Sequence, residues 1–434
     1  MAHVYLSFLG TNNYVPCTYY YGETKIADVR FVQEATATIF CAGWTGQDRL
    51  LIFTTEEAKR SNWLDNGHQD KKTGEVIPLE GLQTRLHRLA LAPSVQAVDI
   101  PEGRSEAEIW QIFQIIFDQI HPGDEVIFDI THAFRSIPML AMVVLPYARV
   151  MKNITIKGIY YGAFEVLGHP AKVDKLPMDQ RLAPIFDLTP FSSLLDWTLA
   201  IDRFLGAGDA GPACDLARTA INPILRETRG QDTAASAIRQ VTSLLSAFSK
   251  QISTCRGREI DQTAVKLKQA LELCRNQRLL PTLQPLLGRV EQSLKAFRGN
   301  AVADGIQAAR WCLNHNLIQQ GFTLLQETMI TAFVLQANND PAERKHRALA
   351  SQAVNIYLDN IEAHNWHPPA SDHPDLINQQ ILFLKNQREL ANIFRNLSQD
   401  RNDLNHAGYV SPSSAEAFAA RLAKYLERVE KLLP

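Results

Sequence analysis

The stretch Asp124-Glu-Val-Ile-Phe-Asp-Ile-Thr-His-Ala-Phe-Arg-Ser-Ile-Pro138 decides the fold of the first part of this chain. Its first seven residues are mostly apolar, which predicts a buried strand, and its end carries a serine and a proline suited to the start of a helix. The polar residues Thr131, His132 and Arg135 are therefore expected between the carboxyl end of a strand and the amino end of a helix. In open parallel sheets this is the edge at which ligands bind.

Similar strands occur on both sides of this stretch and alternate with amphipathic segments, which predicts a parallel sheet with crossover helices. The expected strands are Val4–Leu9, Arg49–Thr54, Val95–Ile100, Glu125–Ile130 and Ile154–Tyr161, with Cys17–Gly22 as a further hairpin strand. The expected helices are Phe31–Phe40, Glu56–Leu64, Leu79–Leu91, Ser105–Ile120 and Ser136–Met151. We therefore expect an α/β, Rossmann-like domain over residues 1–188.

After about residue 190 the apolar residues recur at helical spacing with almost no strand pattern, which predicts an all-α C-terminal region. The expected helices are Phe191–Leu205, Ala207–Glu227, Thr233–Thr254, Asp261–Asn276, Leu283–Arg298, Val302–Asn314, Leu317–Ala337, Ala342–His364, Pro374–Glu389, Leu390–Leu404 and Ser413–Leu433. A break at Gly299-Asn300 suggests a helical linker region over 189–299 and a terminal helical domain over 300–434.

The first strand ends in Leu9-Gly-Thr-Asn-Asn13, a polar loop that matches the one after residue 130. Glycine permits close backbone approach, Thr and Asn side chains suit base or ribose recognition, and an arginine can hold phosphate through two hydrogen bonds. The candidate ligand-binding residues are Gly10, Thr11, Asn12, Asn13, Thr54, Asp129, Thr131, His132 and Arg135. Neither a GxGxxG fingerprint nor a Walker motif occurs, which disfavours a hydride-transfer enzyme and a P-loop ATPase.

A second polar group lies near the end of the chain. The expected helix before it has an apolar stripe that also contains Arg401, at Leu390, Ile393, Phe394, Leu397 and Leu404. A guanidinium on such a stripe is costly unless it is paired or opens into a cleft. Asn402 and His406 share a helical face, but Arg401 and His406 diverge by about 140° at roughly 100° per residue. Two copies facing each other across a dimer axis would assemble a complete site better than one.

Arginine and histidine together suit RNA cleavage through the 2′-OH. His406 can transfer protons near neutral pH, Arg401 can stabilise the charge on the phosphate, and Asn402 can orient either group. We expect a metal-independent mechanism, since no carboxylate cluster or His/Asp metal set accompanies these residues, and no cleavage of DNA, which lacks the 2′-OH.

Composition sets wider limits on function. The 434 residues are 46% hydrophobic and 21% charged, with a formal net charge of −2, so any nucleic-acid contact must come from a local patch. The six cysteines form no CxxC pair, no apolar run approaches the roughly 18 residues of a membrane span, and the start lacks a signal-peptide pattern. These features predict a cytoplasmic protein with free thiols and no membrane partner.

Two motifs resemble those of known families. Asp129-Ile-Thr-His-Ala-Phe-Arg-Ser-Ile-Pro138 resembles the D-x-T-H-x-F-R stretch of CARF domains in type III CRISPR ancillary proteins, and Leu6-Ser-Phe-Leu-Gly-Thr11 resembles their first-strand motif. Arg401-Asn-Asp-Leu-Asn-His406 is similar to the R-x4–6-H motif of HEPN ribonucleases. The order of the two is that of CRISPR-associated CARF–HEPN ribonucleases of the Csx type, and the resemblance covers about 1–188 and 300–434.

The resemblance implies a homodimer, or a higher homo-oligomer, that acts in antiviral defence. Its CARF pair would bind a cyclic oligoadenylate, with cyclic tetra-adenylate favoured over hexa-adenylate, and its HEPN pair would then cut single-stranded RNA. By the same resemblance Arg401, Asn402 and His406 form the catalytic group, with no other cofactor. Thr131 and His132 would also be placed to cut the activator slowly.

Two other functions remain open on the sequence alone. The first is a binding-only regulator, whose helices recruit a partner after a nucleotide binds; no helix-turn-helix with a basic recognition helix supports it. The second is a small-molecule enzyme on the α/β domain, with Asp129 and His132 as acid and base.

Overall fold

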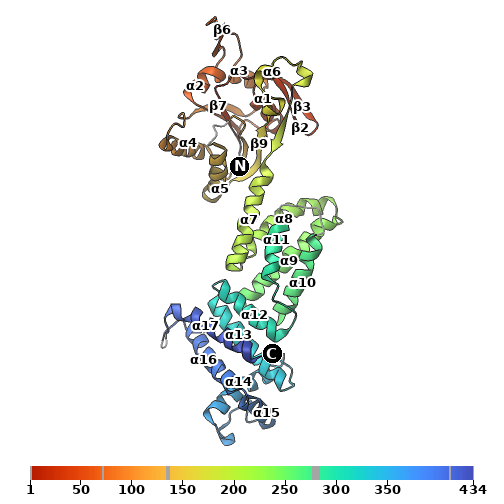
Figure 1. Ribbon diagram of the computed structural model, residues 1–434, viewed down its shortest axis with the longest axis vertical. Helices are drawn as coiled ribbons and strands as arrows, with labels where there is room; N and C mark the ends of the chain where they lie inside the picture. The colour runs from red at the N-terminus through yellow and green to blue at the C-terminus, as the bar shows by residue number, and fades with distance from the viewer. Residues whose placement is uncertain (1, 71–72, 133–136, 276–283, 410–411, 434) are drawn as a thin grey trace. The chain divides into compact units, whose positions relative to one another are not determined.

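A computed structural model describes residues 2–70, 73–132, 137–275, 284–409 and 412–433 (Figure 1). The chain forms two compact units, Met1–Ser193 and Leu194–Pro434. The change from the first to the second falls within the helix α7 (Thr189–Ala207). Arg135, predicted as a ligand-binding residue, lies outside the described residues.

The first unit is built on an eight-stranded sheet with the order β3-β2-β10-β9-β8-β1-β4-β7. Its central strands are parallel and are the five that the sequence predicted: β9 (Thr155–Gly162), β8 (Glu125–Asp129), β1 (His3–Leu9), β4 (Arg49–Thr54) and β7 (Ser94–Asp99). The hairpin strand β2 (Cys17–Tyr21) is confirmed as well. It pairs with two strands that the sequence pattern did not reveal, β3 (Thr24–Val29) and β10 (Leu182–Asp187).

Helices cover both faces of this sheet, as its apolar strands require. One face packs against α4 (Glu106–Gln119) and α5 (Ile137–Lys152), and the other against α1 (Val32–Phe40) and α3 (Leu82–Arg88). Successive residues of β1 alternate between the two cores: Val4, Leu6 and Phe8 face the first, and Tyr5 and Leu9 the second.

Short elements complete the first unit. After β4 come α2 (Glu56–Ala58) and a π-helical turn (Lys59–Trp63), and then a small hairpin of β5 (His68–Gln69) and β6 (Val76–Ile77). Between β9 and β10 lie α6 (Pro170–Val173) and two 3₁₀ turns, Phe164–Leu167 and Met178–Gln180.

The strand order has a switch point between β1 and β8. After β1 the chain forms the hairpin of β2 and β3 at one edge of the sheet, and then adds β4 and β7 on the other side of β1. It returns across β1 for β8 and continues to β9. Connections that leave neighbouring strands in opposite directions open a crevice at their carboxyl ends, where open α/β sheets bind ligands. The loops after β1 and β8 are the two that the sequence selected.

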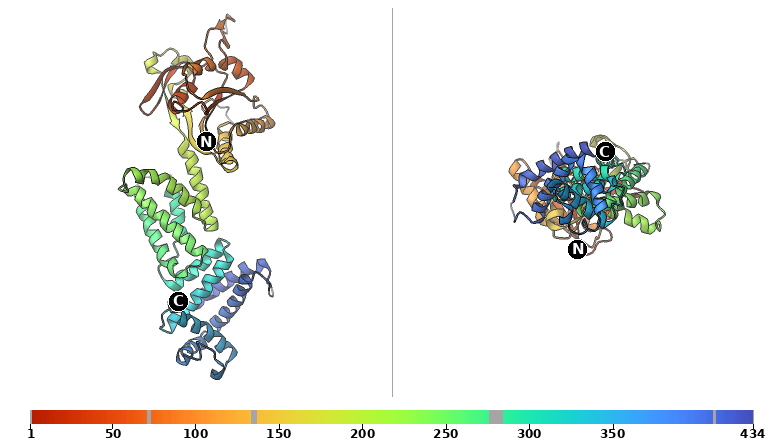
Figure 2. Two further views of the ribbon diagram at one scale, coloured as in Figure 1. Left: turned by 180° about the vertical axis from the view of Figure 1, so that it is seen from behind. Right: turned by 90° about the horizontal axis from the view of Figure 1, so that it is seen from below.

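All regular elements described in the second unit are helices, which confirms the predicted fold class (Figure 2). After α7 they are α8 (Gly211–Glu227), α9 (Thr233–Ser253), α10 (Gly257–Arg275), α11 (Gln284–Ser293), α12 (Ala301–Asn314), α13 (Ile318–Gln336), α14 (Arg344–Asp359), a 3₁₀ turn (Ala363–Asn365), α15 (Pro374–Lys385), α16 (Arg388–Asn405) and α17 (Ala415–Leu432). A single apolar core runs from Ala200 to Leu433, so the expected regions 189–299 and 300–434 share one interior. None of the described helices is long and apolar enough to span a bilayer.

The helix α16 packs against the apolar core through the predicted stripe. Leu390, Ile393, Phe394 and Leu397 are buried, and Leu404 is half-buried. Helices α13 and α17 lie against it and contribute Phe322 and Leu426 to the same core.

The predicted role of this stripe is testable by the variant Leu397→Ala. Leu397 is fully buried, so its truncation should lower the free energy of unfolding by about 3 kcal/mol through lost burial and a residual cavity. The control Leu382→Ala removes a leucine that is 65% exposed on α15 and should change stability by less than about 0.5 kcal/mol. Urea denaturation followed by circular dichroism measures both, and equal losses would contradict the assignment of the core.

Candidate functional site

A buried asparagine, Asn62, holds the loop after β1 through hydrogen bonds to its backbone. Asn62 donates from Nδ2 to the carbonyl oxygens of Gly10 and Asn12, at 2.8 Å each. A Cβ on Gly10 would overlap the hydroxyl of Tyr14, so the close neighbour of this glycine is a side chain of its own loop. Thr11 is half-buried, while Asn12 and Asn13 are exposed, and Oδ1 of Asn13 accepts a hydrogen bond from Nη2 of Arg30 at 3.3 Å.

The loop after β8 is organised by Asp129, which is fully buried. Its Oδ2 accepts hydrogen bonds from the hydroxyls of Tyr5 (2.8 Å) and Thr36 (3.0 Å), and its Oδ1 accepts from the backbone N–H and hydroxyl of Thr131. The Thr131 hydroxyl in turn accepts from the Gly162 N–H at 2.8 Å. Burial raises the pKa of Asp129, and the hydrogen bonds oppose this shift. Asp129 therefore positions Thr131 and does not reach the surface itself.

His132 is the ionisable group nearest this edge. Its ring packs against the ring of Tyr14 with centroids 4.2 Å apart and planes tilted by 35°. Its buried Nε2 has no hydrogen-bond partner among the described residues. Burial lowers the pKa of His132 to about 3, so the imidazole is neutral at physiological pH. It can offer a hydrogen bond to a ligand but no positive charge.

The two loops meet, as expected from their strand positions. The carbonyl oxygen of His132 lies 3.8 Å from the position of a Cβ on Gly10, and Tyr14 connects the two loops. Thr54, predicted as a ligand residue at the end of β4, is fully buried, so its hydroxyl does not line this edge. The next residue, Thr55, caps α2 by accepting from the Ala58 N–H. The sequence analysis missed Asn62 and Tyr14, whose roles depend on contacts with the Gly10–Asn13 loop.

Residues 4–165 match the family model described as "CRISPR system endoribonuclease Csx1, CARF domain". This range contains the parallel strands and both loops of the switch point. The N-terminal unit is a CARF domain. The chain is also 35% identical, over 117 residues, to the CRISPR-associated protein MJ1674 of Methanocaldococcus jannaschii. The matched stretch makes up 26% of this chain and 16% of that protein, so the similarity concerns a small part of the relative.

In the second unit Arg401 is half-buried near the end of α16. Its Nη1 donates to Oε1 of Gln326 on α13 at 3.3 Å, and its buried Nε has no partner. Within the described parts of the chain no ion pair neutralises this guanidinium. A cation with free donors at a partly open position can accept an anion such as phosphate.

Asn402 and His406 lie next to Arg401 and are exposed. His406 is the C-terminal cap residue of α16, and its backbone N–H donates to the carbonyl oxygen of Asn402 at 2.9 Å. In the described residues neither side chain makes a hydrogen bond, and none joins Arg401 to His406. One copy of the chain thus presents the three predicted residues on one helix end without assembling them into a closed site.

Two acids, buried Asp400 and half-buried Asp403, fix the end of α16. Asp400 accepts hydrogen bonds from Arg421 and from the Tyr425 hydroxyl (2.8 Å), both on α17. Asp403 accepts from the Ser413 N–H at 2.8 Å and so restrains the segment after the helix. The backbone that carries Arg401 and His406 is therefore anchored on both sides.

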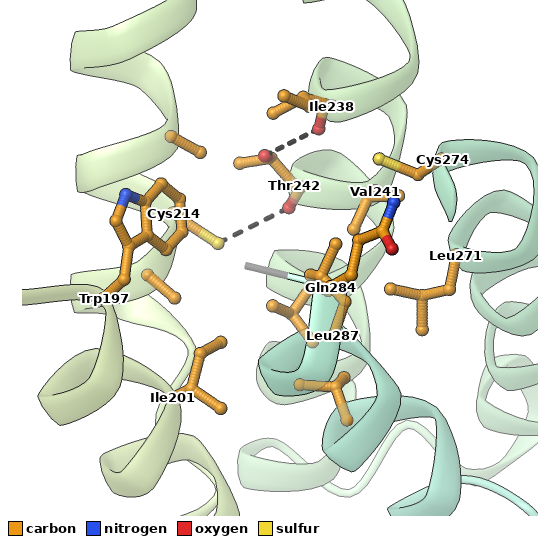
Figure 3. A pocket seen from close by; sticks show the side chains of 14 residues that line it. Trp197, Ile201, Cys214, Ile238, Val241, Thr242, Leu271, Cys274, Gln284 and Leu287 are labelled. Atoms are coloured by element: carbon orange, nitrogen blue, oxygen red, sulfur yellow. Dashed lines mark hydrogen bonds between the residues drawn. The ribbon is translucent and has the colours of Figure 1, made fainter. Parts of the chain in front are cut away.

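An apolar cavity of about 60 Å³ lies between α7, α8, α9, α10 and α11 (Figure 3). Its few polar groups are engaged: the Thr242 hydroxyl donates to Ile238, and the Cys214 thiol contacts the Thr242 carbonyl. The cavity is too small and too apolar for a nucleotide, since ligand pockets measure about 300–1,000 Å³. Among the described residues no group of His, Cys, Asp and Glu side chains could hold a metal ion.

A second, polar hollow in this unit has a volume of about 560 Å³. It is lined by the start of α10 and by parts of α12 and α13, with charged side chains that include Arg256, Arg258 and the ion pair of Arg347 with Glu327. Cys255 lines it as well, and the charge of Arg401 partly opposes the rise that burial causes in the pKa of this thiol.

The structural role of Asp129 is testable by Asp129→Ala, which leaves the hydroxyls of Tyr5 and Thr36 and the N–H of Thr131 without their acceptor. We expect a loss of about 3 kcal/mol in the free energy of unfolding, measured by urea denaturation. The control is Asp99→Ala at the end of β7, where an exposed pair with Lys59 should contribute less than about 1 kcal/mol. A smaller loss for Asp129 than for Asp99 would show that its hydrogen bonds do not stabilise the fold.

Proposed function

We propose that this chain is an endoribonuclease of type III CRISPR antiviral defence that a cyclic oligoadenylate activates. The CARF domain would sense the activator, and the second unit would cut single-stranded RNA as a HEPN ribonuclease. The observation that carries the nuclease is the half-buried guanidinium of Arg401, which has free donors and no acidic partner among the described residues.

The loops after β1 and β8 at the switch point suit the binding of a cyclic oligoadenylate. Thr11, Asn12, Asn13 and Thr131 offer neutral donors and acceptors, and neutral His132 adds one more. Arg135 would supply a direct phosphate contact. We favour cyclic tetra-adenylate over hexa-adenylate as the ring.

The reaction follows from the chemistry of three side chains. The 2′-OH of the substrate attacks the adjacent phosphorus, and the 5′-oxygen leaves with a proton. His406 would transfer protons, Arg401 would stabilise the charge on the pentacoordinate phosphorus, and Asn402 would orient the phosphate or the imidazole. These three residues suffice for the reaction without a metal, and the required 2′-OH spares DNA.

A homodimer would complete the catalytic group of the second unit and cover an exposed apolar face of the first. Arg401 and His406 diverge on one helix, so a second copy supplies the missing partner. In the first unit, α5 buries Val144, Leu145 and Ala148 but presents Met139, Met142, Val143, Tyr147, Val150 and Met151 to solvent. The exposed ring of Trp110 on α4 extends this apolar face through Phe113 to Tyr147. Continuous apolar surface of this kind marks a protein interface, and we assign it to a second copy of the chain.

Two other functions make different predictions. A binding-only regulator would bind the ring and cut nothing. A small-molecule enzyme with Asp129 as acid or base has weaker support, because both oxygens of this carboxylate are occupied and its surface is buried.

The nuclease is tested by cleavage of a fluorescent single-stranded RNA by the full chain in EDTA, with and without cyclic tetra- and hexa-adenylate. We expect cleavage only when one of the two cyclic oligoadenylates is present. The rate should fall at least about a hundredfold in His406→Ala, which lacks the group that transfers protons, and in Arg401→Ala, which lacks the group that binds the phosphate. A substrate with 2′-deoxy sugars should stay intact.

The matched control is His364→Ala, which removes another exposed histidine of the same unit and should leave the rate unchanged. Tight binding of a ring without any cleavage would favour the regulator. Cleavage that persists in both His406→Ala and Arg401→Ala would place the catalytic site elsewhere.

The dimer is tested by Val143→Glu, which places a charge on the exposed face of α5. Val143 is 57% exposed, so the fold should tolerate the change while the interface does not. Sedimentation velocity should show a dimer for the wild type and a monomer for the variant. Val166→Glu is the control, because Val166 is 61% exposed outside this face and should leave the dimer intact. A monomeric wild type, or equal dissociation of both variants, would contradict the assignment.

A further inference from the structure

Arg30 is a buried arginine next to the Gly10–Asn13 loop, which the activator would contact. It follows β3 and is only 5% exposed. Its Nη1 donates to the carbonyl oxygen of Glu80 (2.8 Å), and its Nη2 donates to Oδ1 of Asn62 (3.1 Å) and of Asn13 (3.3 Å). Its Nε is buried and has no partner among the described residues.

The charge of Arg30 is not neutralised by a direct ion pair. Its three hydrogen-bond acceptors are neutral, and no ion pair of the described residues includes it. The nearest acid in sequence, Glu34, accepts from the backbone N–H groups of Arg30 and Phe31 and forms an ion pair with Arg85 at 2.7 Å. Burial lowers the pKa of Arg30, and the charge of Arg85 adds to this effect, while the charge of Glu34 opposes it in part. A buried cation without a carboxylate partner is costly, so a nearby anion would relieve its environment.

The same guanidinium is tied to the loop that the activator would contact. Asn62 accepts from Arg30 and, at 2.9 Å, interacts with Nε2 of His68, while its amide holds Gly10 and Asn12. Asn13, the last residue of the loop, is bonded to Arg30 directly. The unneutralised cation therefore lies one hydrogen bond away from the exposed edge of the candidate site.

We propose that Arg30 is the buried cation that draws the phosphates of the activator to this loop and sets the loop's conformation through Asn13 and Asn62. The inference rests on the proposed function of the CARF domain as the binder of an anionic ring. Arg30 does not touch the ligand; it acts through its electric field and through the two asparagines. Burial strengthens such a field, because little water screens it.

The test is the affinity of the full chain for cyclic tetra-adenylate, measured by calorimetry at two salt concentrations. Arg30→Gln keeps hydrogen-bonding capacity and removes the charge. We expect an affinity at least tenfold lower than that of the wild type and a weaker dependence on salt. Arg30→Lys keeps the charge and should bind within about threefold of the wild type.

The matched control is Arg49→Gln at the opposite, amino-terminal edge of the sheet. Arg49 is also largely buried and binds Asp124 (2.7 Å) and the Gln119 carbonyl oxygen (2.9 Å), so its loss should lower the melting temperature without changing the affinity. An Arg30→Gln chain with wild-type affinity and salt dependence would overturn the inference, as would an equal loss of affinity in Arg49→Gln.

Two further outcomes keep the test decisive. If Arg30→Gln does not fold, Arg30→Lys decides: binding with the wild-type salt dependence supports a role of the charge, and a tenfold loss overturns it. If the folded wild type binds neither ring, the proposed function of the CARF domain is wrong, and this result is distinct from any effect of Arg30.

Discussion

The pairing of β1 with β8 is the constraint on which the candidate sensor site depends. These strands are neighbours in the sheet although more than 100 residues separate them, and Ser7 lies beside Asp129 in their register. The pairing brings the loops after both strands to one edge, and Asp129 fixes the second loop through bonds to Tyr5, Thr36 and Thr131. Its carboxylate thus joins β1, α1 and the β8 loop in one buried cluster. Asp129, which the sequence suggested as a ligand contact, is buried and holds the candidate ligand residue Thr131 in place.

A second feature, common to both units, is an arginine that is partly or fully buried and forms no ion pair among the described residues. Arg30 in the first unit and Arg401 in the second each bind neutral oxygen acceptors, and each has a buried Nε without a partner among the described residues. By contrast, Arg49 and Arg85 form ion pairs with the buried acids Asp124 and Glu34. Both candidate ligands, a ring of nucleotides and an RNA strand, carry phosphates. A guanidinium that lacks a carboxylate keeps its attraction for such anions, at a cost in stability that the surrounding fold must offset.

The sequence predicted the five parallel strands and nearly every helix because their apolar residues recur at strand or helical spacing. It did not predict β10, whose Pro184 weakens a strand pattern, or β3, where polar residues interrupt it. The loops of the sensor edge were predicted from their position after strands, but the burial of Thr54 and Asp129 was not, because burial depends on which elements pack above a residue. Asn62 and Arg30 had no local pattern at all. Their roles arise from contacts with a loop that lies about 20 to 50 residues away in the chain.

The proposed dimer would give the two units a shared requirement, which would explain why they occur in one chain. A cyclic oligoadenylate with two-fold symmetry can contact two copies of the loop after β1, and each copy brings its own Arg30. A helix end that presents Arg401 and His406 in different directions likewise needs a second copy to form a closed site. Under this proposal the cyclic oligoadenylate would activate RNA cleavage only if it bound the cutting arrangement of the dimer more tightly than the idle one. Moving a population from 1:99 to 99:1 takes a difference of about 10⁴-fold in affinity. When charges on two subunits attract one bound cyclic oligoadenylate, the strength of this attraction depends on the distance between the subunits. The attraction within a pocket of a single subunit does not depend on that distance. In the proposed dimer, a buried cation in each subunit would therefore be a physical means by which the affinity for the cyclic oligoadenylate depends on the arrangement of the two subunits.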